Sequence, residues 1–144
     1  HKKFFSVTQI AALMSENIMD HYQARLMPQL MLPVPLHYQK YNQRGFNQSE
    51  LIAKKLSSLF NIALNHTLLT RTKATEKLEN KTKSQRLKIM NQAFACDSLA
   101  HGIDHIALID DVYTTGATTK ACIKAIQQQN PKIQVDVWCY ARTP

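Results

Sequence analysis

The stretch His105-Ile-Ala-Leu-Ile-Asp-Asp-Val-Tyr-Thr-Thr-Gly-Ala-Thr-Thr119 decides the fold. Its apolar residues 106–109 are too few for a helix and lack polar alternation, so they predict a buried strand of a parallel sheet. Asp110 and Asp111 come next, and we expect them at the carboxyl end of this strand, where open α/β sheets bind their ligands. A helical pattern begins after the following turn. The stretch therefore predicts a strand, a ligand-binding turn and a helix.

The turn itself is made of small residues. Because they have little side-chain bulk, their backbone N–H groups can approach an anion closely at the positive end of the helix dipole. Two carboxylates beside such a phosphate cradle suit a phosphorylated sugar, since they can accept hydrogen bonds from ribose hydroxyls. A Mg²⁺ ion would offset the repulsion between these acids and the ligand's phosphates. The predicted cradle consists of Thr114, Thr115, Gly116, Ala117 and Thr118.

An ordinary strand–turn–helix with a solvated aspartate pair is the alternative interpretation. Tandem acids directly after a buried strand repel each other, which favours a bound ligand. The segment also resembles the phosphoribosyl-pyrophosphate (PRPP) signature of type I phosphoribosyltransferases, in which two acids and a variable pair precede Thr-Thr-Gly-Ala/Ser-Thr. Tyr113 is the second residue of the variable pair. It could stack on a sugar or base, or point to solvent.

The composition indicates a single domain, residues 1–144, and no membrane insertion, since no apolar run approaches the length of a membrane span. Cys96, Cys122 and Cys139 form no Cys-x-x-Cys pair, which gives neither a zinc knuckle nor a disulfide framework. We expect buried thiols in a cytoplasmic protein. Because residue 1 is His and not Met, we also expect a fragment of a longer protein.

The net charge of +8 is concentrated in residues 71–90, which hold seven basic residues against two glutamates. This segment could bind nucleic acid, attract a polyanionic small molecule or be a solvated surface. If single-stranded DNA binds, we expect it mainly at this segment, together with Lys40 and Arg44, through phosphate contacts that depend on salt. The candidate DNA-binding residues are Lys81, Lys83 and Lys88.

Helical and strand patterns alternate along the chain and predict a doubly wound, mostly parallel sheet. The apolar spacing predicts two helices before the signature and one after it, ended by Asn130-Pro131. The basic segment becomes more helix-like towards Met90. The predicted helices run over 7–22, 48–60 and from about 117, and the predicted strands over 30–36, 64–69, 106–109 and 133–140.

A second constellation is Pro33-Val-Pro-Leu36 followed by Arg44-Gly-Phe-Asn-Gln48 at a helix start. Gly45 permits an unusual backbone angle or a close ligand approach. Arg44 can fork onto a phosphate, and the Asn-Gln pair can cap the helix or bond a ligand. Taken alone, Arg-Gly-Phe is equally compatible with a structural helix cap.

Together the two constellations resemble the ComF family, also called GntX-like proteins. The resemblance covers essentially the whole chain and implies a type I phosphoribosyltransferase fold that binds PRPP. It places Arg44-Gly45 at a pyrophosphate-binding loop and makes residues 71–90 a mobile hood. The family's cysteine-rich zinc ribbon, which usually precedes this domain, is absent from these residues. The matching stretches are Lys3-Phe4, 33–36, 44–48, 71–75, Arg86, Ala93-Phe94, 110–112, 114–118 and 137–143.

The family's role is natural competence, the import of single-stranded DNA, and relatives are associated with use of external DNA or gluconate. For a transferase, the resemblance implies that Asp110, Asp111 and Arg44 act in catalysis. The acids would hold the ribose hydroxyls and, mostly through water, Mg²⁺. Arg44, with Lys3 as a second candidate, would take the pyrophosphate. The chain departs from the family pattern at three positions of the expected hood, Leu78, Lys81 and Ile89.

Two hypotheses follow from different classes of protein. The first is an enzyme that transfers phosphoribose to an acceptor that no residue identifies. The second is a non-catalytic module that binds PRPP, a nucleotide or single-stranded DNA and acts through competence-machinery proteins. A complete ligand cradle combined with a degraded hood would favour the second hypothesis.

Overall fold

The computed structural model describes residues 5–36, 42–43, 45–72 and 80–142. Its centre is a four-stranded sheet in the order β2-β1-β5-β6, with every neighbouring pair parallel. The parallel sheet predicted from the alternating pattern is therefore confirmed. The strands are β1 (Leu30–Pro33), β2 (Ala63–Leu64), β5 (His105–Tyr113) and β6 (Gln134–Arg142).

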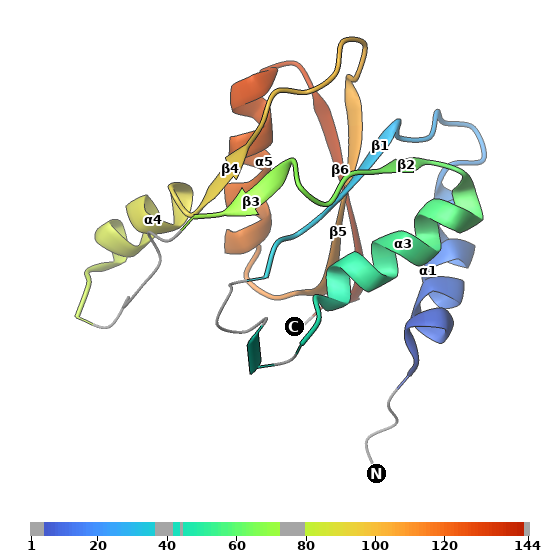
Figure 1. The fold of residues 1–144 in the computed structure, drawn as a ribbon, viewed down its shortest axis with the longest axis horizontal. Coiled ribbons are helices and arrows are strands. Elements are labelled where there is room, and N and C mark those ends of the chain that lie inside the picture. Colours follow the sequence, from blue (N-terminus) through green and yellow to red (C-terminus); the bar gives the residue numbers. More distant parts are fainter. Residues whose placement is uncertain (1–4, 37–41, 44, 73–79, 143–144) are drawn as a thin grey trace.

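Helices cover both faces of this sheet (Figure 1). On one face, α1 (Val7–His21) and α3 (Gln48–Phe60) pack against Met31 and Ile109. On the other, α5 (Ala117–Gln129) packs against the alternate residues of the same strands, such as Leu32 and Leu108. Because both faces are covered, the central strands read as continuous apolar runs.

The helices begin at the positions that their capping residues predict. Ser6 starts α1 with a capping box, in which its hydroxyl accepts from the Gln9 backbone and the Gln9 side chain accepts from the Ser6 backbone. Asn47 caps α3, and Gly116 in the left-handed conformation starts α5. Local sequence therefore sets where these elements begin.

A small antiparallel sheet, which the sequence patterns did not predict, stands beside the main one (Figure 1). It pairs β3 (Leu69–Arg71) with β4 (Phe94–Cys96), and α4 (Lys83–Asn91) lies between them in the chain. The single strand expected over 64–69 was wrong, because its two ends belong to different sheets. Strands of two or three residues are too short to show a period.

The strand near the end of the chain also differs from its expected pattern. The alternation in 133–140 suggested a half-buried strand with Val135 and Val137 on the buried side. In β6 both valines are only half-buried, while Trp138 on the opposite face is the most buried residue. Both faces of this edge strand are covered in part, which the alternation could not reveal.

The segment 71–90 is described in part, since residues 73–79 lie outside the described residues. Its later half forms α4, which starts at a capping box between Thr82 and Gln85 and has no buried residue. The expected mobility of a hood stays a prediction. No helix in the described part of the chain combines the length and apolar character needed to cross a membrane.

Candidate functional site

The predicted aspartate pair and cradle share one cavity of about 390 Å³. The cavity lies where β1 ends, beside the first turns of α3 and α5. The last residue of β1, Pro33, pairs with Ile109, immediately before the two acids. The lining residues include Val34, Asn47, Ser49, Arg71, Asp110, Asp111, Thr114, Gly116, Thr118 and Thr119.

The acids do not end their own strand as expected. β5 continues through them to Tyr113 and remains paired with β6, so that Asp110 lies opposite Cys139. What ends at this point is the other neighbour, β1. The loss of one neighbouring strand opens the space in front of the acids, while the remaining neighbour keeps their backbone extended.

Asp110 is the more buried acid, with 8% of its surface exposed. Its Oδ1 accepts a hydrogen bond from the Asp111 backbone N–H at 2.9 Å, and Asp111 Oδ1 accepts from the Val112 N–H at 2.9 Å. Burial, followed by the charge of Asp111, raises the pKa of Asp110 to about 6, although a hydrogen bond from Ser49 works against this. Asp110 therefore carries a carboxylate that is poorly compensated by its surroundings.

Among the residues described, no lysine or arginine forms an ion pair with either acid. Two uncompensated carboxylates in one cavity are the oxygen donors that Mg²⁺ prefers, and a cation beside them would relieve their repulsion. Within the same part of the chain, no three His, Cys, Asp or Glu side chains gather as a metal site. The donor set therefore fits a Mg²⁺ ion that keeps waters and takes its remaining ligands from a bound phosphate.

The cradle has the geometry that its glycine predicted. Gly116 has φ +82° and begins α5 without a side-chain cap, and the first helical bond runs from Lys120 N–H to Gly116 C=O at 2.9 Å. The N–H groups at 117–119 therefore precede the first regular helical bonds, and helix starts of this kind bind phosphate. Thr114, Gly116 and Thr118 line the cavity.

Two members of the predicted cradle, Thr115 and Ala117, do not line the cavity. Thr115 Oγ1 accepts from the Ala117 N–H at 3.3 Å and thereby holds the turn. Thr119, which was not predicted, lines the cavity and is buried. It lies one helical turn below the glycine, a position that no local pattern marks as ligand-facing.

Tyr113 folds back over its own loop. Its ring lies under the Arg142 guanidinium, 4.9 Å from the ring centroid, and its hydroxyl lies against Gly116. The half-buried ring thus supports the turn from below. Neither of the two orientations considered from the sequence, on a ligand or towards solvent, describes this position.

Arg71 is a candidate binding residue that sequence reasoning passed over. It ends β3, lines the cavity of the two acids, and stacks its guanidinium on the Phe94 ring at 5.3 Å from the centroid. Its Nε is buried, and no hydrogen-bond partner for it exists in the described structure. Burial lowers the pKa of Arg71. The guanidinium of an arginine that lines a cavity and is held in place by an aromatic ring is suited to binding an anion.

The start of α3 brings the second constellation to the same cavity. The Asn47 side chain accepts from the Ser49 N–H and donates to the Val34 C=O, both at 3.1 Å, which ties the helix start to the end of β1. Gly45 has φ +73°, the unusual angle that was predicted. The structural helix cap is therefore real, and it is the Asn that provides it. Lys3, Lys40 and Arg44 lie outside the described residues.

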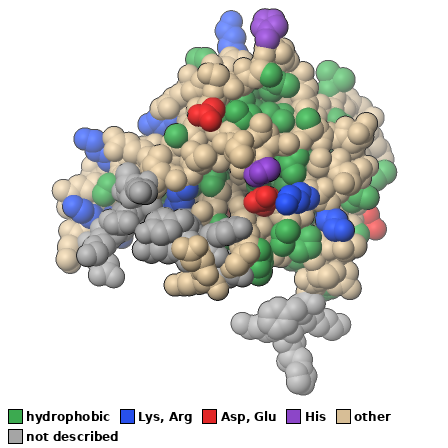
Figure 2. All heavy atoms as spheres, viewed as in Figure 1, with side chains coloured by type: hydrophobic (Ala, Val, Ile, Leu, Met, Phe, Trp, Pro, Cys, Tyr) green, Lys and Arg blue, Asp and Glu red, His purple; other side chains and the backbone are tan. Residues whose placement is uncertain are grey.

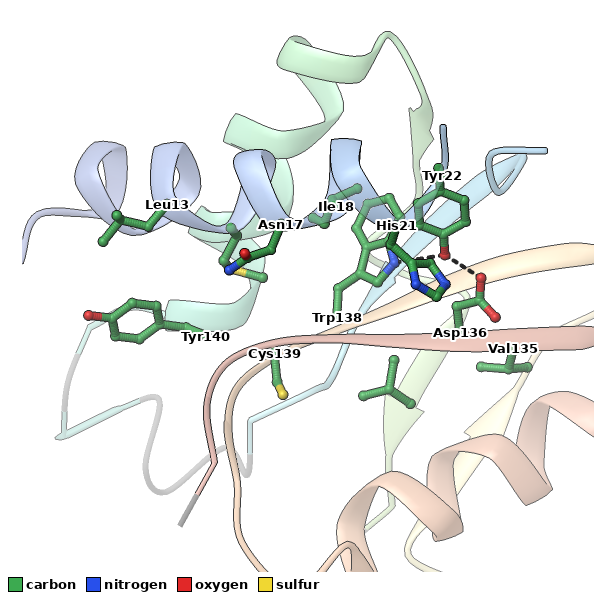
Figure 3. A pocket seen from close by; sticks show the side chains of 12 residues that line it. Leu13, Asn17, Ile18, His21, Tyr22, Val135, Asp136, Trp138, Cys139 and Tyr140 are labelled. Carbon is green, nitrogen blue, oxygen red and sulfur yellow. Dashed lines mark hydrogen bonds between the residues drawn. The ribbon is translucent and has the colours of Figure 1, made fainter. Parts of the chain in front are cut away.

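A different cavity, of about 500 Å³, lies between α1 and β6 (Figure 3). Trp138 Nε1 donates to the Tyr22 hydroxyl at 3.1 Å, and that hydroxyl donates to Asp136, which also bonds His105 Nε2 at 2.8 Å. These polar groups satisfy one another, and the cavity shares no lining residue with the acid site. We therefore assign the Trp138–Tyr22–Asp136–His105 chain a structural role.

The expectation of buried thiols is met by two of the three cysteines, while Cys139 is half-buried. Cys96, Cys122 and Cys139 are free, and the first two are buried. Burial and the nearby charge of Asp110 raise the pKa of the Cys122 thiol, so it stays protonated beside the acid site. It is a packing residue of α5.

Comparison with known proteins gives related sequences and related folds. No protein-family model matches the chain. The DNA utilization protein YhgH of Salmonella typhi is 32% identical over 147 residues, which is 98% of this chain and 64% of that protein. Competence protein F of Haemophilus influenzae is 28% identical, covering 81% of this chain and 51% of that one. Competence protein ComFC of Bacillus subtilis is 30% identical, and the match covers 79% of this chain and 45% of that protein. The chain thus spans less than two thirds of these relatives.

Two solved structures with a similar fold are phosphoribosyltransferases. A hypoxanthine phosphoribosyltransferase from Trypanosoma cruzi, a lysine-to-arginine mutant in complex with the product IMP, has a TM-score of 0.51 at 15% identity. The match covers all of this chain and 78% of that protein's chain. An HPRT in which glutamine replaces an invariant aspartic acid has a TM-score of 0.50 at 12% identity. This match covers 96% of this chain and 77% of that protein's chain. At these identities the likeness concerns the fold, which is an α/β fold of the type I phosphoribosyltransferase kind.

Proposed function

We propose that this chain, a homologue of the ComF-type competence proteins and of the DNA utilization proteins, binds PRPP with Mg²⁺ in the cavity of Asp110 and Asp111. The homology and the fold support a competence-linked, phosphoribosyltransferase-like protein. To this we add three proposals: PRPP as the ligand, Mg²⁺ as the ion and a cytoplasmic location.

One observation carries the proposal: two uncompensated carboxylates and a glycine-led helix start, whose N-cap residue Gly116 provides no side-chain cap, open into the same cavity. A ligand that satisfies both must have hydroxyl groups near one end and a phosphate at the other. A ribose 5′-phosphate has this arrangement. The pyrophosphate on its C1 would add negative charge, for which the Arg71 guanidinium at the wall of the same cavity offers hydrogen-bond donors.

Each group would then have a separate task. Asp110 and Asp111 accept hydrogen bonds from the ribose hydroxyls, and the backbone N–H groups at the start of α5 hold the 5′-phosphate. Arg71 joins Arg44, and Lys3 as a second candidate, in holding the pyrophosphate. A bound Mg²⁺ would supply charge neutralisation for the pyrophosphate, held by the acids through water.

Transfer of phosphoribose would require the C1–O bond to break as pyrophosphate leaves. Residues that neutralise the pyrophosphate lower the barrier to this step, and the fixed ribose limits the approach of an acceptor to one face. Among the described residues lining the cavity, none is an evident base for an acceptor. The proposal is therefore binding of PRPP or a nucleotide, either for transfer or as a module that acts through competence-machinery proteins.

Isothermal titration calorimetry with PRPP, with and without Mg²⁺, tests this function. The double variant D110N/D111N should bind at least about tenfold more weakly, on the scale of lost charged hydrogen bonds. The variant D97N/D104N removes the same charge from two exposed positions outside the cavity and should bind normally. Equal affinity of the two double variants, or no binding by the parent, would overturn the assignment. A parallel assay of PRPP hydrolysis and pyrophosphate exchange separates the enzyme from the binding module.

A further inference from the structure

Strand β6 is one edge of the main sheet, and its outer side has no partner strand among the described residues. The Gln134 N–H donates to the Asp104 C=O at 2.8 Å, so the backbone groups of Gln134 face β5. Because these groups alternate in direction along a strand, those of every second residue face β5 and those of the residues between face outward. The residues whose N–H and C=O groups face outward are Val135, Val137, Cys139 and Ala141.

This edge lacks the features by which proteins usually protect an exposed strand. Natural edge strands are short, bulged, or carry lysine or proline. β6 has nine residues, keeps one register with β5 from end to end, and contains neither lysine nor proline. Of its two charged side chains, Asp136 is bonded to Tyr22 and His105. Arg142 stacks on the Tyr113 ring. An unprotected edge of this length indicates that another strand pairs with it.

A groove runs along the same edge, where α1 follows β6 (Figure 3). It consists of the cavity of about 500 Å³ between α1 and β6 and a neighbouring hollow of about 540 Å³ at the start of β6. The two share His21, Tyr22 and Asp136, and we call them together the edge groove. Part of its wall is apolar, since Leu13 and Trp138 line it. A strand added to β6 would therefore have an apolar cavity beside it.

We propose that the outer edge of β6 binds an extended segment of a partner protein as an additional strand of the sheet. Hydrogen bonds to the outward backbone groups would supply affinity. The edge groove would accept alternate side chains of the segment, because the side chains of a strand alternate between its faces. The outward groups span residues 135–141, so a segment of about seven residues can use all of them.

The charges around the edge favour an acidic segment. Arg25 and Lys132 line the groove where β6 begins, and Arg142 ends the strand. Two acids also line this part of the groove, but Asp136 is already bonded within the domain, which leaves Asp104. Cations at both ends of the strand suit a segment with an acid at each end and apolar residues at alternate positions between them.

A second copy of this chain fits the same edge poorly. On one face of the sheet α1 packs over β6, with the Tyr22 ring edge-on to Trp138. Antiparallel pairing of β6 with β6 of a second copy would bring two α1 helices together above adjacent strands. Strands lie about 4.8 Å apart, whereas packed helices need about 8–10 Å between their axes.

The charge of the chain also opposes self-association. Each copy carries a net charge of +8, and Figure 2 shows Lys and Arg side chains, in blue, at several places over the visible face. Two copies therefore repel each other, while an acidic partner is attracted. The edge groove shares no lining residue with the acid cavity, so failure of this proposal does not decide the binding of PRPP, or the reverse.

Amide hydrogen exchange followed by NMR, with and without a probe peptide, tests the proposal. The probe is the acetylated and amidated peptide Glu-Thr-Val-Thr-Leu-Thr-Val-Thr-Glu, which is apolar at alternate positions and acidic at both ends. At about 1 mM peptide, the N–H groups of Val137, Cys139 and Ala141 should exchange about tenfold more slowly, as expected for a site that is about 90% occupied. Those of Trp138 and Tyr140, which face β5, should change little.

Two N-methylated forms of the probe are the matched controls. One is methylated at its three apolar residues and the other at the threonines between them, so each keeps every side chain and loses the donors along one edge. Only one edge of an added strand faces β6, so one form should protect the three amides and the other should not. Protection by both forms, protection by neither, or no protection by the unmethylated probe would overturn the proposal.

A pair of charge variants tests the acidic character of the segment. K132E/R142E should weaken binding of the probe at least about tenfold, because it reverses a cation at each end of β6. The control K55E/K120E reverses the same charge at exposed positions outside the edge groove and should keep most of the affinity. Circular dichroism melting shows that both variants are folded. Equal losses in the two variants would mean that net charge alone attracts the probe, and the acid-ended segment would be wrong.

Discussion

The hydroxyl of Tyr113 occupies the place where a β-carbon on Gly116 would project. Such a carbon would also lie 2.9 Å from Cζ of the same ring, closer than packed side chains approach. Since Gly116 has φ +82°, two separate features exclude a side chain there, the backbone angle and the tyrosine beneath it. The turn before α5 and the ring of Tyr113 are thus fitted to each other.

Gly116→Ala should therefore destabilise the protein by about 1–3 kcal/mol, from the strained backbone angle and the displaced ring together. In the Tyr113→Ala background the ring is gone, so the same substitution should cost only about 1 kcal/mol, the part due to the angle. Urea unfolding of the four proteins gives the coupling energy directly. The free energy of PRPP binding to G116A should fall by more than its free energy of unfolding does. A coupling energy near zero would show that Tyr113 does not restrict Gly116.

Much of this site could be predicted from the sequence, because its parts are local. The acid pair, the glycine and the helix start follow each other within one stretch of chain, and the apolar run that precedes them identifies the strand. The bounds of α1 and α3 were predicted nearly to the residue, since each has an amphipathic face and a capping side chain. Short-range signals were sufficient for these elements.

The remaining features depend on contacts between distant residues. Arg71 reaches the cavity because β3 pairs with β4, which brings Arg71 opposite Phe94. Neither three-residue strand has a period that a sequence pattern could detect. The fold-back of Tyr113 under Arg142 depends on the pairing of β5 with β6. For such residues the topology has to be known before the side chain can be placed.

Asp110→Asn should stabilise the folded protein at neutral pH. Burial and Asp111 raise the pKa of Asp110 to about 6, from an ordinary value of 3.8. Between these values the folded state binds more protons than the unfolded state, so the free energy of unfolding falls as the pH rises through this window. At pH 7.5 the variant should be more stable by up to about 3 kcal/mol, and the difference should nearly vanish below pH 4.

Urea unfolding at pH 4, 5, 6 and 7.5 measures this difference. Asp97→Asn, at an exposed acid, is the control and should follow the parent at every pH. If D110N were the less stable protein at pH 7.5, the carboxylate would be favourably compensated. The inference that Asp110 is an uncompensated charge, which supports the Mg²⁺ proposal, would then be wrong.

Arg71→Met should weaken PRPP binding by about 10- to 100-fold, the range of hydrogen bonds between charged groups. Methionine keeps much of the side-chain volume over Phe94, so the fold should survive. Arg71→Lys keeps the charge but loses the planar fork and should recover only part of the affinity. Arg25→Met, at a position outside the acid cavity, is the matched control for calorimetry. Full recovery with lysine would mean that Arg71 acts by charge alone.

Tyr22→Phe tests the structural role of the polar chain between α1 and β6. Loss of the hydroxyl leaves the buried Trp138 Nε1 without its acceptor and takes a donor from Asp136, which should cost about 1–3 kcal/mol of stability. The bonds from Tyr22 and His105 lower the pKa of Asp136 against the effect of burial, so their contribution is present above its unfolded pKa and is lost in acid. The difference between variant and parent should therefore shrink below about pH 4. PRPP affinity, measured by calorimetry, should be unchanged, because the chain shares no residue with the acid cavity. A loss of affinity without a loss of stability would instead make this cavity part of the functional site.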